Sequence, residues 1–234
     1  TAKEIMTQLE ALGNAQTKKT WINHGGKEPL FGVKIEELKK IVKKVKTNHE
    51  LALELYATGN SDAMYLAGLI SDPMKMTKKN LQSWADAAYW SMLSEYAVSW
   101  TAAESPFGTE MGLKWIDDKK EHVATAGWST LAAITSVKDD SEIDIKLYKS
   151  LLKRVEKEIH KERNRVKYTM NSFVISVGCY VTALTEECRR IGEKIGNVTV
   201  DMGGTACKVP AVNPYIDKVI ARGNLGKKRK TAKC

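Results

Sequence analysis

The sequence predicts an all-α fold: a solenoid of helical repeats, or α-α superhelix, that ends in a basic C-terminal tail. Apolar residues recur at helical spacing along most of the chain, and no convincing strand pattern appears in its first half. Turns of about three to six residues separate the helical segments. Helix starts near Asn48, Trp84, Glu121 and Arg163 recur about every 35 to 42 residues, a period typical of stacked helical hairpins.

The first half of the chain predicts short helices that begin at capping residues. Residues Trp21 to Gly32 are rich in Gly and Pro and are expected to form a loop. Asn48, Ser61 and Thr77 are expected to cap the helices that follow them, because their side-chain oxygens can accept free backbone N–H groups. The predicted helices are 2–12, 35–46, 48–58, 61–70 and 77–88.

The second half continues in the same pattern. Ser141 and Thr185 are expected to cap two of its helices. A short extended piece at 198–200 leads into a turn at 201–204. The predicted helices are 91–103, 106–118, 122–135, 141–160, 163–183, 185–195 and 210–221.

The helical period is typical of HEAT-like repeats, in which each hairpin buries its apolar face only against its neighbours. We therefore expect one helical-repeat domain over residues 1–222, with a concave face on which a long anionic ligand could lie. Residues 223–234 are expected to form a basic tail. A globular all-α bundle is the alternative.

Five of the six tryptophans lie between Trp84 and Trp128, together with several acidic residues. An aromatic and acidic segment inside a basic helical protein indicates a surface that meets something planar or anionic. For any single tryptophan, however, a place in the core is the favoured interpretation.

The net charge of +9 is distributed unevenly. Residues 206–234 contain eight Lys or Arg residues against one acid, so an anionic partner is expected to contact this end. A second basic cluster separates two helices near residue 163. Each cluster has a simpler interpretation, either a solubilising tail or a group of charges at a helix end. The residues predicted to bind nucleic acid are Lys161, Arg163, Arg165, Lys167, Lys227, Lys228, Arg229 and Lys230.

Other classes of function lack support in the sequence. The four cysteines form no CxxC motif, so neither a metal site nor a disulfide framework is expected. No phosphate-binding glycine loop is present, and the histidines have no triad-like partners, so no cofactor is predicted. No apolar run is long enough to cross a membrane. With no export signal, these features predict a cytoplasmic protein.

Three segments carry a resemblance to a known family: Phe31–Ile41, Leu51–Tyr56 and Tyr65–Ile70. They resemble the opening of the bacterial DNA alkylation repair proteins, which are all-α HEAT-like proteins that include the alkylpurine DNA glycosylases. The segments 204–210 and 226–231 look like a subgroup of the same family. The resemblance implies a basic concave face that cups DNA.

The resemblance also implies positions for the glycosylase site, which has a Trp, an Asp four residues later, an Arg pair and a second Trp. The first Trp position falls on Trp90, and the Asp position falls on Ser94, beside Glu95. An aromatic face and a carboxylate would stabilise the positive charge that develops as the glycosidic bond breaks. In an α-helix, residue i+5 points away from residue i, so Glu95 is expected to be poorly placed beside Trp90. The remaining positions fall near Ala126, Gly127 and Cys179.

These observations lead to a first hypothesis and two alternatives. The first is a DNA-binding protein of this family that docks duplex DNA, including damaged or branched forms, with weak or no base excision. The second is an active alkylpurine DNA glycosylase that uses Trp90 and Glu95 as tentative catalytic residues. The third is a scaffold for protein partners, with the aromatic segment as a peptide groove.

Overall fold

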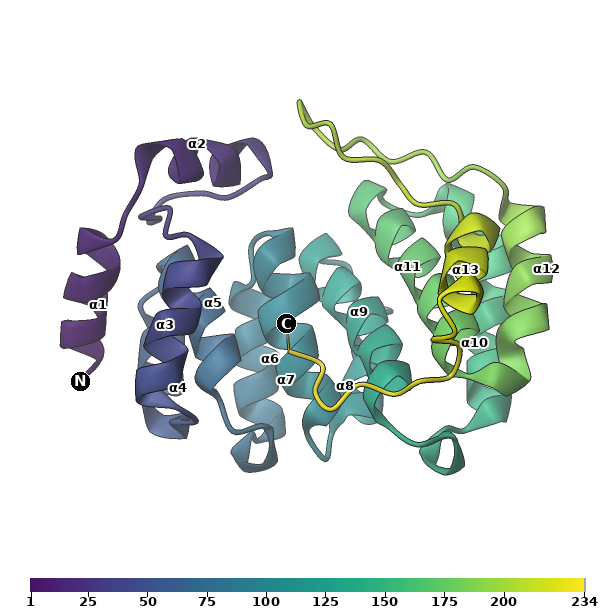
Figure 1. Ribbon diagram of the computed structural model, residues 1–234, viewed down its shortest axis with the longest axis horizontal. Helices are drawn as coiled ribbons and strands as arrows, with labels where there is room; N and C mark the ends of the chain where they lie inside the picture. Colours follow the sequence, from purple (N-terminus) through teal and green to yellow (C-terminus); the bar gives the residue numbers. More distant parts are fainter. Residues whose placement is uncertain (234) are drawn as a thin grey trace.

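The computed structural model describes residues 1–233 and confirms the all-α prediction (Figure 1). No β-strand occurs among these residues, and 198–200 has no regular secondary structure. The α-helices are α1 (Ala2–Ala11), α2 (Ala15–Asn23), α3 (Ile35–Val45), α4 (His49–Ala57), α5 (Ser61–Ile70), α6 (Lys78–Ala87), α7 (Ser99–Glu104), α8 (Gly108–Trp115), α9 (Glu121–Val137), α10 (Ile145–Glu158), α11 (Asn164–Tyr180), α12 (Thr185–Ile195) and α13 (Val212–Ala221).

Five shorter helical segments join or extend these helices. Four are 3₁₀ helices, and one is a π-helix that runs directly into α7. They are η1 (Pro73–Lys75), η2 (Leu93–Val98, the π-helix), η3 (Asp140–Glu142), η4 (Ile159–Lys161) and η5 (Thr182–Leu184). The loop expected from Trp21 begins three residues later, because α2 continues to Asn23.

Two of the five predicted helix caps are correct. The side chains of Asn48 and Thr77 accept backbone N–H groups at the starts of α4 and α6. Ser61 and Ser141 were wrong as caps, because neighbouring Asn60 and Asp144 accept those N–H groups instead. Thr185 is also not a cap, since it is the first residue inside α12.

The helices form two rows. α5, the continuous η2–α7 helix, α9 and α11 contact one another in succession and make the inner row. α4, α6, α8 and α10 each precede one inner helix in the chain and lie outside it (Figure 1). Since the chain reverses direction in every hairpin, all inner helices run the same way. Their N-terminal ends therefore lie along one edge of the solenoid, and their C-terminal ends along the other.

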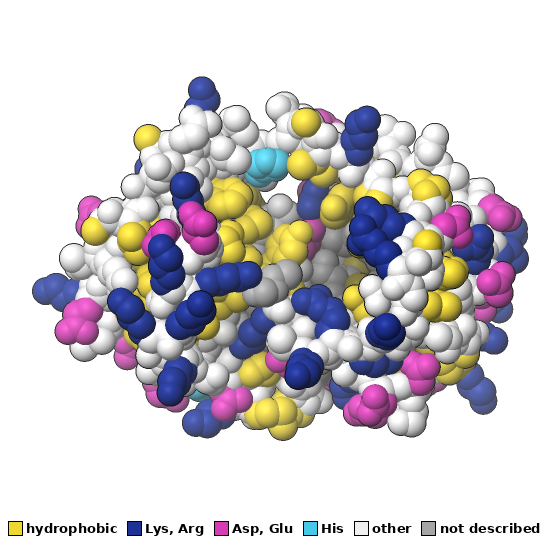
Figure 2. Space-filling view, viewed as in Figure 1, with side chains coloured by type: hydrophobic (Ala, Val, Ile, Leu, Met, Phe, Trp, Pro, Cys, Tyr) yellow, Lys and Arg dark blue, Asp and Glu magenta, His cyan; other side chains and the backbone are white. Residues whose placement is uncertain are grey.

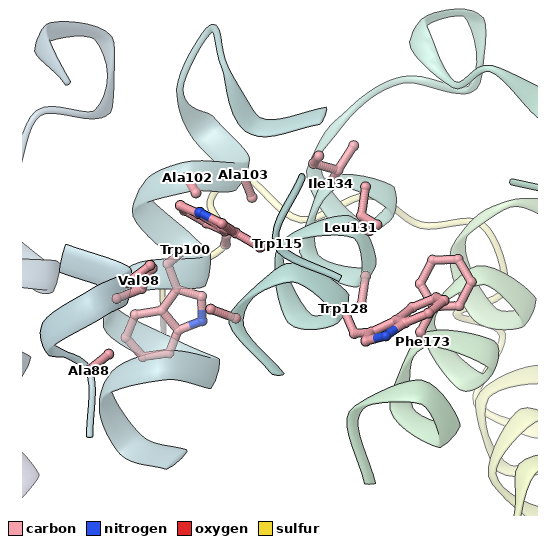
Figure 3. Close-up of a cluster of buried hydrophobic side chains, with 14 of the residues drawn as sticks. Ala88, Val98, Trp100, Ala102, Ala103, Trp115, Trp128, Leu131, Ile134 and Phe173 are labelled. Atoms are coloured by element: carbon pink, nitrogen blue, oxygen red, sulfur yellow. The ribbon is translucent and has the colours of Figure 1, made fainter. Parts of the chain in front are cut away.

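Five tryptophans lie between Trp84 and Trp128, and Figure 3 shows three of them, Trp100, Trp115 and Trp128, in a cluster of buried hydrophobic side chains. All five are at most 6% exposed, so the core interpretation is correct for each. Trp128 meets the ring of Phe173 edge to face at 5.2 Å, which joins α9 to α11. Trp100 makes a similar contact with Tyr65 of α5. Rings of this size bury much apolar surface, so they hold neighbouring repeats together.

Residues 223–233, here called the C-terminal strap, run along the edge formed by the C-terminal ends of the inner helices (Figure 1). The strap meets α11, α9, α7 and α5 in that order. Packed helices lie about 8–10 Å apart, which an extended chain covers in roughly three residues. Its path is marked by hydrogen bonds from Gly226 to Cys179, Arg229 to Ser136, Ala232 to Glu104 and Lys233 to Leu69. Cys234 lies outside the described residues.

Two lysines of the strap bind carbonyl oxygens at the ends of inner helices. Lys228 Nζ donates to Thr135 O of α9 at 2.9 Å and to Tyr180 O of α11 at 2.8 Å. Lys233 Nζ donates to Leu69 O of α5 at 3.2 Å. These carbonyls have no partner within their own helix, and the helix dipole makes this end negative. The strap thus places positive charge at the negative C-terminal ends of the inner helices.

Candidate functional site

A groove with a volume of about 520 Å³ lies at the opposite edge, beside the N-terminal ends of the inner helices. Its walls come from the end of α2, residues 89–96, the first turns of α9 and α11, and the loop 201–207. Figure 2 shows the molecule hollowed between its two ends, with hydrophobic, Lys and Arg side chains around the hollow. The positive ends of η2, α9 and α11 converge at this edge, an arrangement that attracts anions. The lining also contains two acids, Glu121 and Asp201.

The loop between α12 and α13 closes one side of the groove. Asn164, the first residue of α11, exchanges two hydrogen bonds of 2.8 Å with the backbone of Asp201. The loop then reaches α2, where a Cβ atom added to Gly203 would lie 3.5 Å from the carbonyl oxygen of Asn23. The two ends of the solenoid therefore approach each other across the groove.

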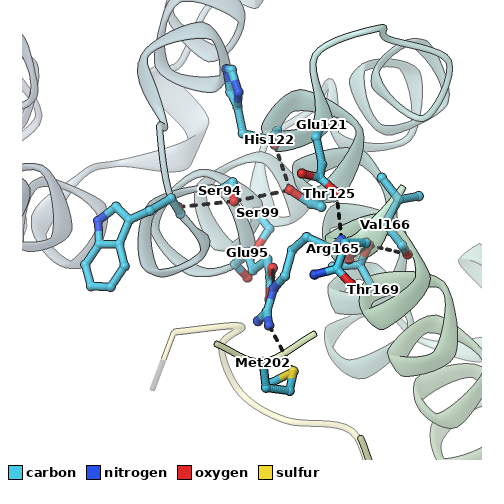
Figure 4. A network of polar contacts seen from close by, with 12 residues as sticks. Ser94, Glu95, Ser99, Glu121, His122, Thr125, Arg165, Val166, Thr169 and Met202 are labelled. Carbon is cyan, nitrogen blue, oxygen red and sulfur yellow. Dashed lines mark hydrogen bonds and ion pairs between the residues drawn. The ribbon is translucent and has the colours of Figure 1, made fainter. Parts of the chain in front are cut away.

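An ion pair between Glu95 and Arg165 lies below the groove (Figure 4). Arg165 donates from Nε to Oε1 at 2.5 Å and from Nη2 to Oε2 at 2.7 Å, so both carboxylate oxygens are occupied. The Glu95 side chain is only 6% exposed and that of Arg165 is 25% exposed. The guanidinium group also stacks on the ring of Tyr168, 4.0 Å from its centroid. Arg165 and Tyr168 line the groove, whereas Glu95 lies behind them.

Burial acts on both members of this pair. It raises the pKa of Glu95, and the hydrogen bonds and charge of Arg165 oppose that rise. Burial alone would lower the pKa of Arg165, but the hydrogen bonds and charge of Glu95 hold it above the ordinary value. A bidentate pair of this kind is among the stronger interactions in proteins. Both oxygens of the Glu95 carboxylate are consequently bound to the guanidinium group of Arg165.

Trp90 is held in the core as well as at the edge of the groove. Its indole N–H donates to Ser61 Oγ at 2.8 Å, and its ring lies 6.3 Å from that of Trp21. The residue is 6% exposed. Little of the indole face is therefore open to a ligand in the groove.

The expected orientation of Glu95 assumed a regular α-helix, and this assumption is wrong for residues 93–98. A π-helix forms i to i+5 hydrogen bonds, so it needs one more residue per turn than an α-helix. The i+5 spacing from Trp90 is consequently no argument against Glu95. The chemistry available to Glu95 is limited by its ion pair with Arg165 rather than by its spacing from Trp90.

The other positions implied by the glycosylase resemblance are structural. Ser94 is buried and accepts the hydroxyl of Thr125 at 3.3 Å. Gly127 allows close packing, because an added Cβ would lie 2.7 Å from the backbone nitrogen of Ile116. Ala126 and Cys179 are buried.

The predicted cluster near residue 163 is divided by the fold. Arg163 Nη1 donates to the carbonyl oxygens of Asp118 and Lys119, at 3.0 and 2.7 Å, and thereby ties α11 to the turn after α8. Lys161 is exposed and Lys167 is partly exposed. Among the residues described, neither lysine has a carboxylate within ion-pair distance. Arg165 alone of the four lines the groove.

The predicted residues of the tail are divided in the same way. Lys228 is directed inward to helix ends and to Asp140, 2.8 Å away. Lys227 and Arg229 line a second pocket, between the strap and α11. Lys230 is exposed.

Sequence reasoning missed three components of the groove: His122, Tyr168 and the loop 201–207. His122 Nε2 lies 3.1 Å from the carbonyl oxygen of Asp86 in the described structure. The sequence carries no local signal for these residues, because they meet only when the ends of the solenoid approach. Residues 1–233 contain no group of three His, Cys, Asp or Glu side chains arranged to hold a metal ion. No helix among them is long and apolar enough to cross a membrane.

Comparison with known proteins places this geometry in a family. Residues 5–187 match the model of the family described as DNA alkylation repair enzyme. The chain belongs to this family. The family membership expected from the resemblance is confirmed, and the match covers the inner helices that border the groove.

Relatives within the DNA alkylation repair family match nearly the whole chain. The protein Lin0241 of Listeria innocua is 33% identical over 96% of this chain and 99% of its own. Lmo0209 of Listeria monocytogenes is 33% identical over 93% of this chain and 96% of its own. A solved structure with a TM-score of 0.91 is 39% identical and covers 99% of both chains. It is described as one of a new family of proteins related to the HEAT-like repeat DNA glycosylases, with affinity for branched DNA structures.

Proposed function

We propose that this protein binds DNA in the groove at the N-terminal ends of its inner helices, prefers branched DNA, and excises no alkylated bases. The observation that carries the proposal is the groove itself, in a chain 39% identical to a protein described as having affinity for branched DNA structures. Backbone N–H groups and helix dipoles at such an edge attract phosphate oxygens. The net charge of +9 adds a long-range attraction for a polyanion.

The environment of Glu95 supports the proposed absence of base excision. The glycosylase chemistry outlined above needs a carboxylate that faces the sugar as positive charge develops on it. Both oxygens of Glu95 are bound by Arg165, and the side chain is withdrawn from the groove. Ser94, at the position implied for the acid, has no carboxylate. The two acids that line the groove, Glu121 and Asp201, accept the backbone N–H groups of Arg165 and Gly203 at 2.7 and 2.8 Å. We therefore propose that the groove holds DNA without supplying this chemistry.

The outward cations of the strap and of the 161–167 segment are proposed to add phosphate contacts. We assign this role to Lys161, Lys167, Lys227, Arg229 and Lys230. Lys228 is left out because its ammonium group is bound to helix ends.

A negative charge in the groove should weaken DNA binding. Ser91 lines the groove, and Ser83 is an exposed residue of the outer helix α6 that does not line it. In Ser91→Glu we expect affinity for a labelled four-way junction to fall by about an order of magnitude, because the carboxylate repels the phosphates. Fluorescence anisotropy across a salt series measures both the affinity and the number of phosphates contacted.

The matched control is Ser83→Glu, which changes the net charge by the same amount on the outer row of helices and should bind like the wild type. A duplex of the same length and composition should bind more weakly than the junction. Equal affinities for the two Glu variants would remove the groove from the proposal. A wild-type protein that binds duplex as tightly as the junction would contradict the preference for branched DNA.

The wild-type protein should release no methylated purine from DNA treated with a methylating agent. The free bases are measured by chromatography after incubation with excess protein. Release that disappears in Glu95→Gln or Trp90→Ala would assign excision to this site and overturn the proposal.

A further inference from the structure

A second pocket, with a volume of about 570 Å³, lies on the same face of α11 as the groove. One stripe of α11, from Tyr168 to Tyr180, forms its floor, with both partly exposed and buried side chains. α13 forms one wall and the C-terminal strap another. Tyr168 lines both the groove and this pocket, so the two spaces adjoin.

Aromatic rings line this pocket from two helices. Tyr168 and Tyr180 come from α11, and Tyr215 comes from α13. The Tyr215 side chain is 46% exposed, so this large ring is not part of the core. Exposed aromatic faces beside positive charge are the platforms on which single-stranded nucleic acids stack their bases.

Positive charge lines the pocket without a balancing acid. Arg222, Lys227 and Arg229 all belong to its wall, and no Asp or Glu does. None of these three cations has a carboxylate within ion-pair distance in the described part of the chain. Arg154 and Arg190, by contrast, are paired with Asp117 and Glu156. Cations left unpaired around a cavity are available for an anionic ligand.

The pocket is built for binding rather than for reaction. Cys179 lies on its floor, and burial raises the pKa of its thiol to about 11, so the thiol is neutral at physiological pH. Its lining contains neither His nor a carboxylate that could act as a base. A volume of this size suits a single small ligand or one group of a larger one.

We propose that this pocket binds one unpaired nucleotide, with its base on Tyr180 and Tyr215 and its phosphate among Arg222, Lys227 and Arg229. The nucleotide has two possible sources, a free mononucleotide or an unpaired nucleotide of a DNA strand. The second source rests on the proposed function, since the adjoining groove would hold the rest of the DNA. Unpaired nucleotides arise at branch points, where base pairing is interrupted.

The test uses the full-length protein and removes one ring and one charge from α13. The variant is Tyr215→Ala with Arg222→Gln. The control is Ile220→Ala with Lys218→Gln, which removes one exposed apolar side chain and one charge from the same helix outside the pocket. The probes are labelled thymidine monophosphate and two labelled four-way junctions, one fully paired and one with a single unpaired thymidine at its branch point.

The wild type and the control should bind the junction with the unpaired thymidine more tightly than the fully paired junction. The pocket variant should lose that preference, roughly tenfold in affinity, because stacking of one base contributes about 1–3 kcal/mol. Its affinity for the fully paired junction should remain within about twofold of the control, because both variants lose one positive charge. Loss of mononucleotide binding in the same variant would identify the free nucleotide as a ligand as well.

Two outcomes separate this inference from the proposed function. If the variant retains the wild-type preference for the unpaired thymidine and the wild type binds no mononucleotide, the pocket assignment is overturned while DNA binding stands. If the wild type binds neither junction but binds the mononucleotide, and the variant does not, the DNA function fails and the pocket stands. Circular dichroism and the Tm of the variant, expected to match the control, exclude a folding defect.

Discussion

Glu95→Ala should lower the free energy of unfolding by about 3–5 kcal/mol, because it leaves the Arg165 guanidinium group buried without its partner. The carboxylate is the only acceptor that binds two nitrogens of Arg165 in the described structure, at 2.5 and 2.7 Å. Urea denaturation measures the loss as a shift of the midpoint at constant m-value. The affected contact joins η2 to α11 across α9, so one residue should affect the whole inner row.

Replacing both members should recover most of the loss. In Glu95→Leu with Arg165→Met no buried charge remains, and apolar replacements of buried pairs are often neutral or stabilising. The comparison variant is Glu110→Ala, which breaks an ion pair with Lys78 whose side chains are 60% and 49% exposed. Its effect should be at most about 1 kcal/mol. Equal effects of Glu95→Ala and Glu110→Ala would mean that the buried pair does not form in solution.

Lys228→Met should lower the free energy of unfolding by about 1.5–3 kcal/mol, the usual contribution of hydrogen bonds to a charged group. The Lys228 side chain is 17% exposed, and its ammonium group binds the carbonyl oxygens of both Thr135 and Tyr180. The methionine keeps the length of the side chain but leaves the ends of α9 and α11 without a donor. Thermal unfolding should show a lower Tm.

The matched variant is Lys230→Met, two residues later in the same strap. Lys230 is exposed, and its ammonium group binds no carboxylate within ion-pair distance among residues 1–233. Its Tm should remain that of the wild type. If the two variants lose stability equally, the strap does not hold the helix ends and acts only as a charged tail.

Much of the fold was predictable because helix formation depends on neighbouring residues. The spacing of apolar side chains located the helices of both rows, and Asn48 and Thr77 were identified as caps. The errors at Ser61 and Ser141 were small shifts between neighbouring polar residues. Several residues in each stretch could accept the same N–H groups, and the path of the preceding loop selects among them.

The helix that carries Glu95 was harder to predict for a different reason. Its sequence is compatible with an α-helix, and the π-helical register at 93–98 appears only in the folded chain. Arg165 was identified as a nucleic-acid contact because charge alone was visible in the sequence. Its partner lies 70 residues away, so no local pattern could reveal the pair.

The roles of the individual strap cations were also visible only in the folded chain. Composition located the positive charge but did not distinguish Lys228, which binds helix ends, from Lys227 and Arg229, which line a pocket. The carbonyl groups that bind Lys228 belong to α9 and α11, which end at Val137 and Tyr180, far from Lys228 in the sequence.

By itself, the sequence determined the all-α repeat architecture and the charge of the C-terminal end, because these depend on periodicity and composition along the chain. The family came from the resemblance of three segments in its first half. Only the tertiary structure decided that the tryptophans belong to the core and that Glu95 is bound by Arg165. It also decided that the C-terminal strap covers one edge of the solenoid while the groove lies at the other. These features depend on contacts between residues far apart in the sequence, and parallel stacking of the inner helices creates them.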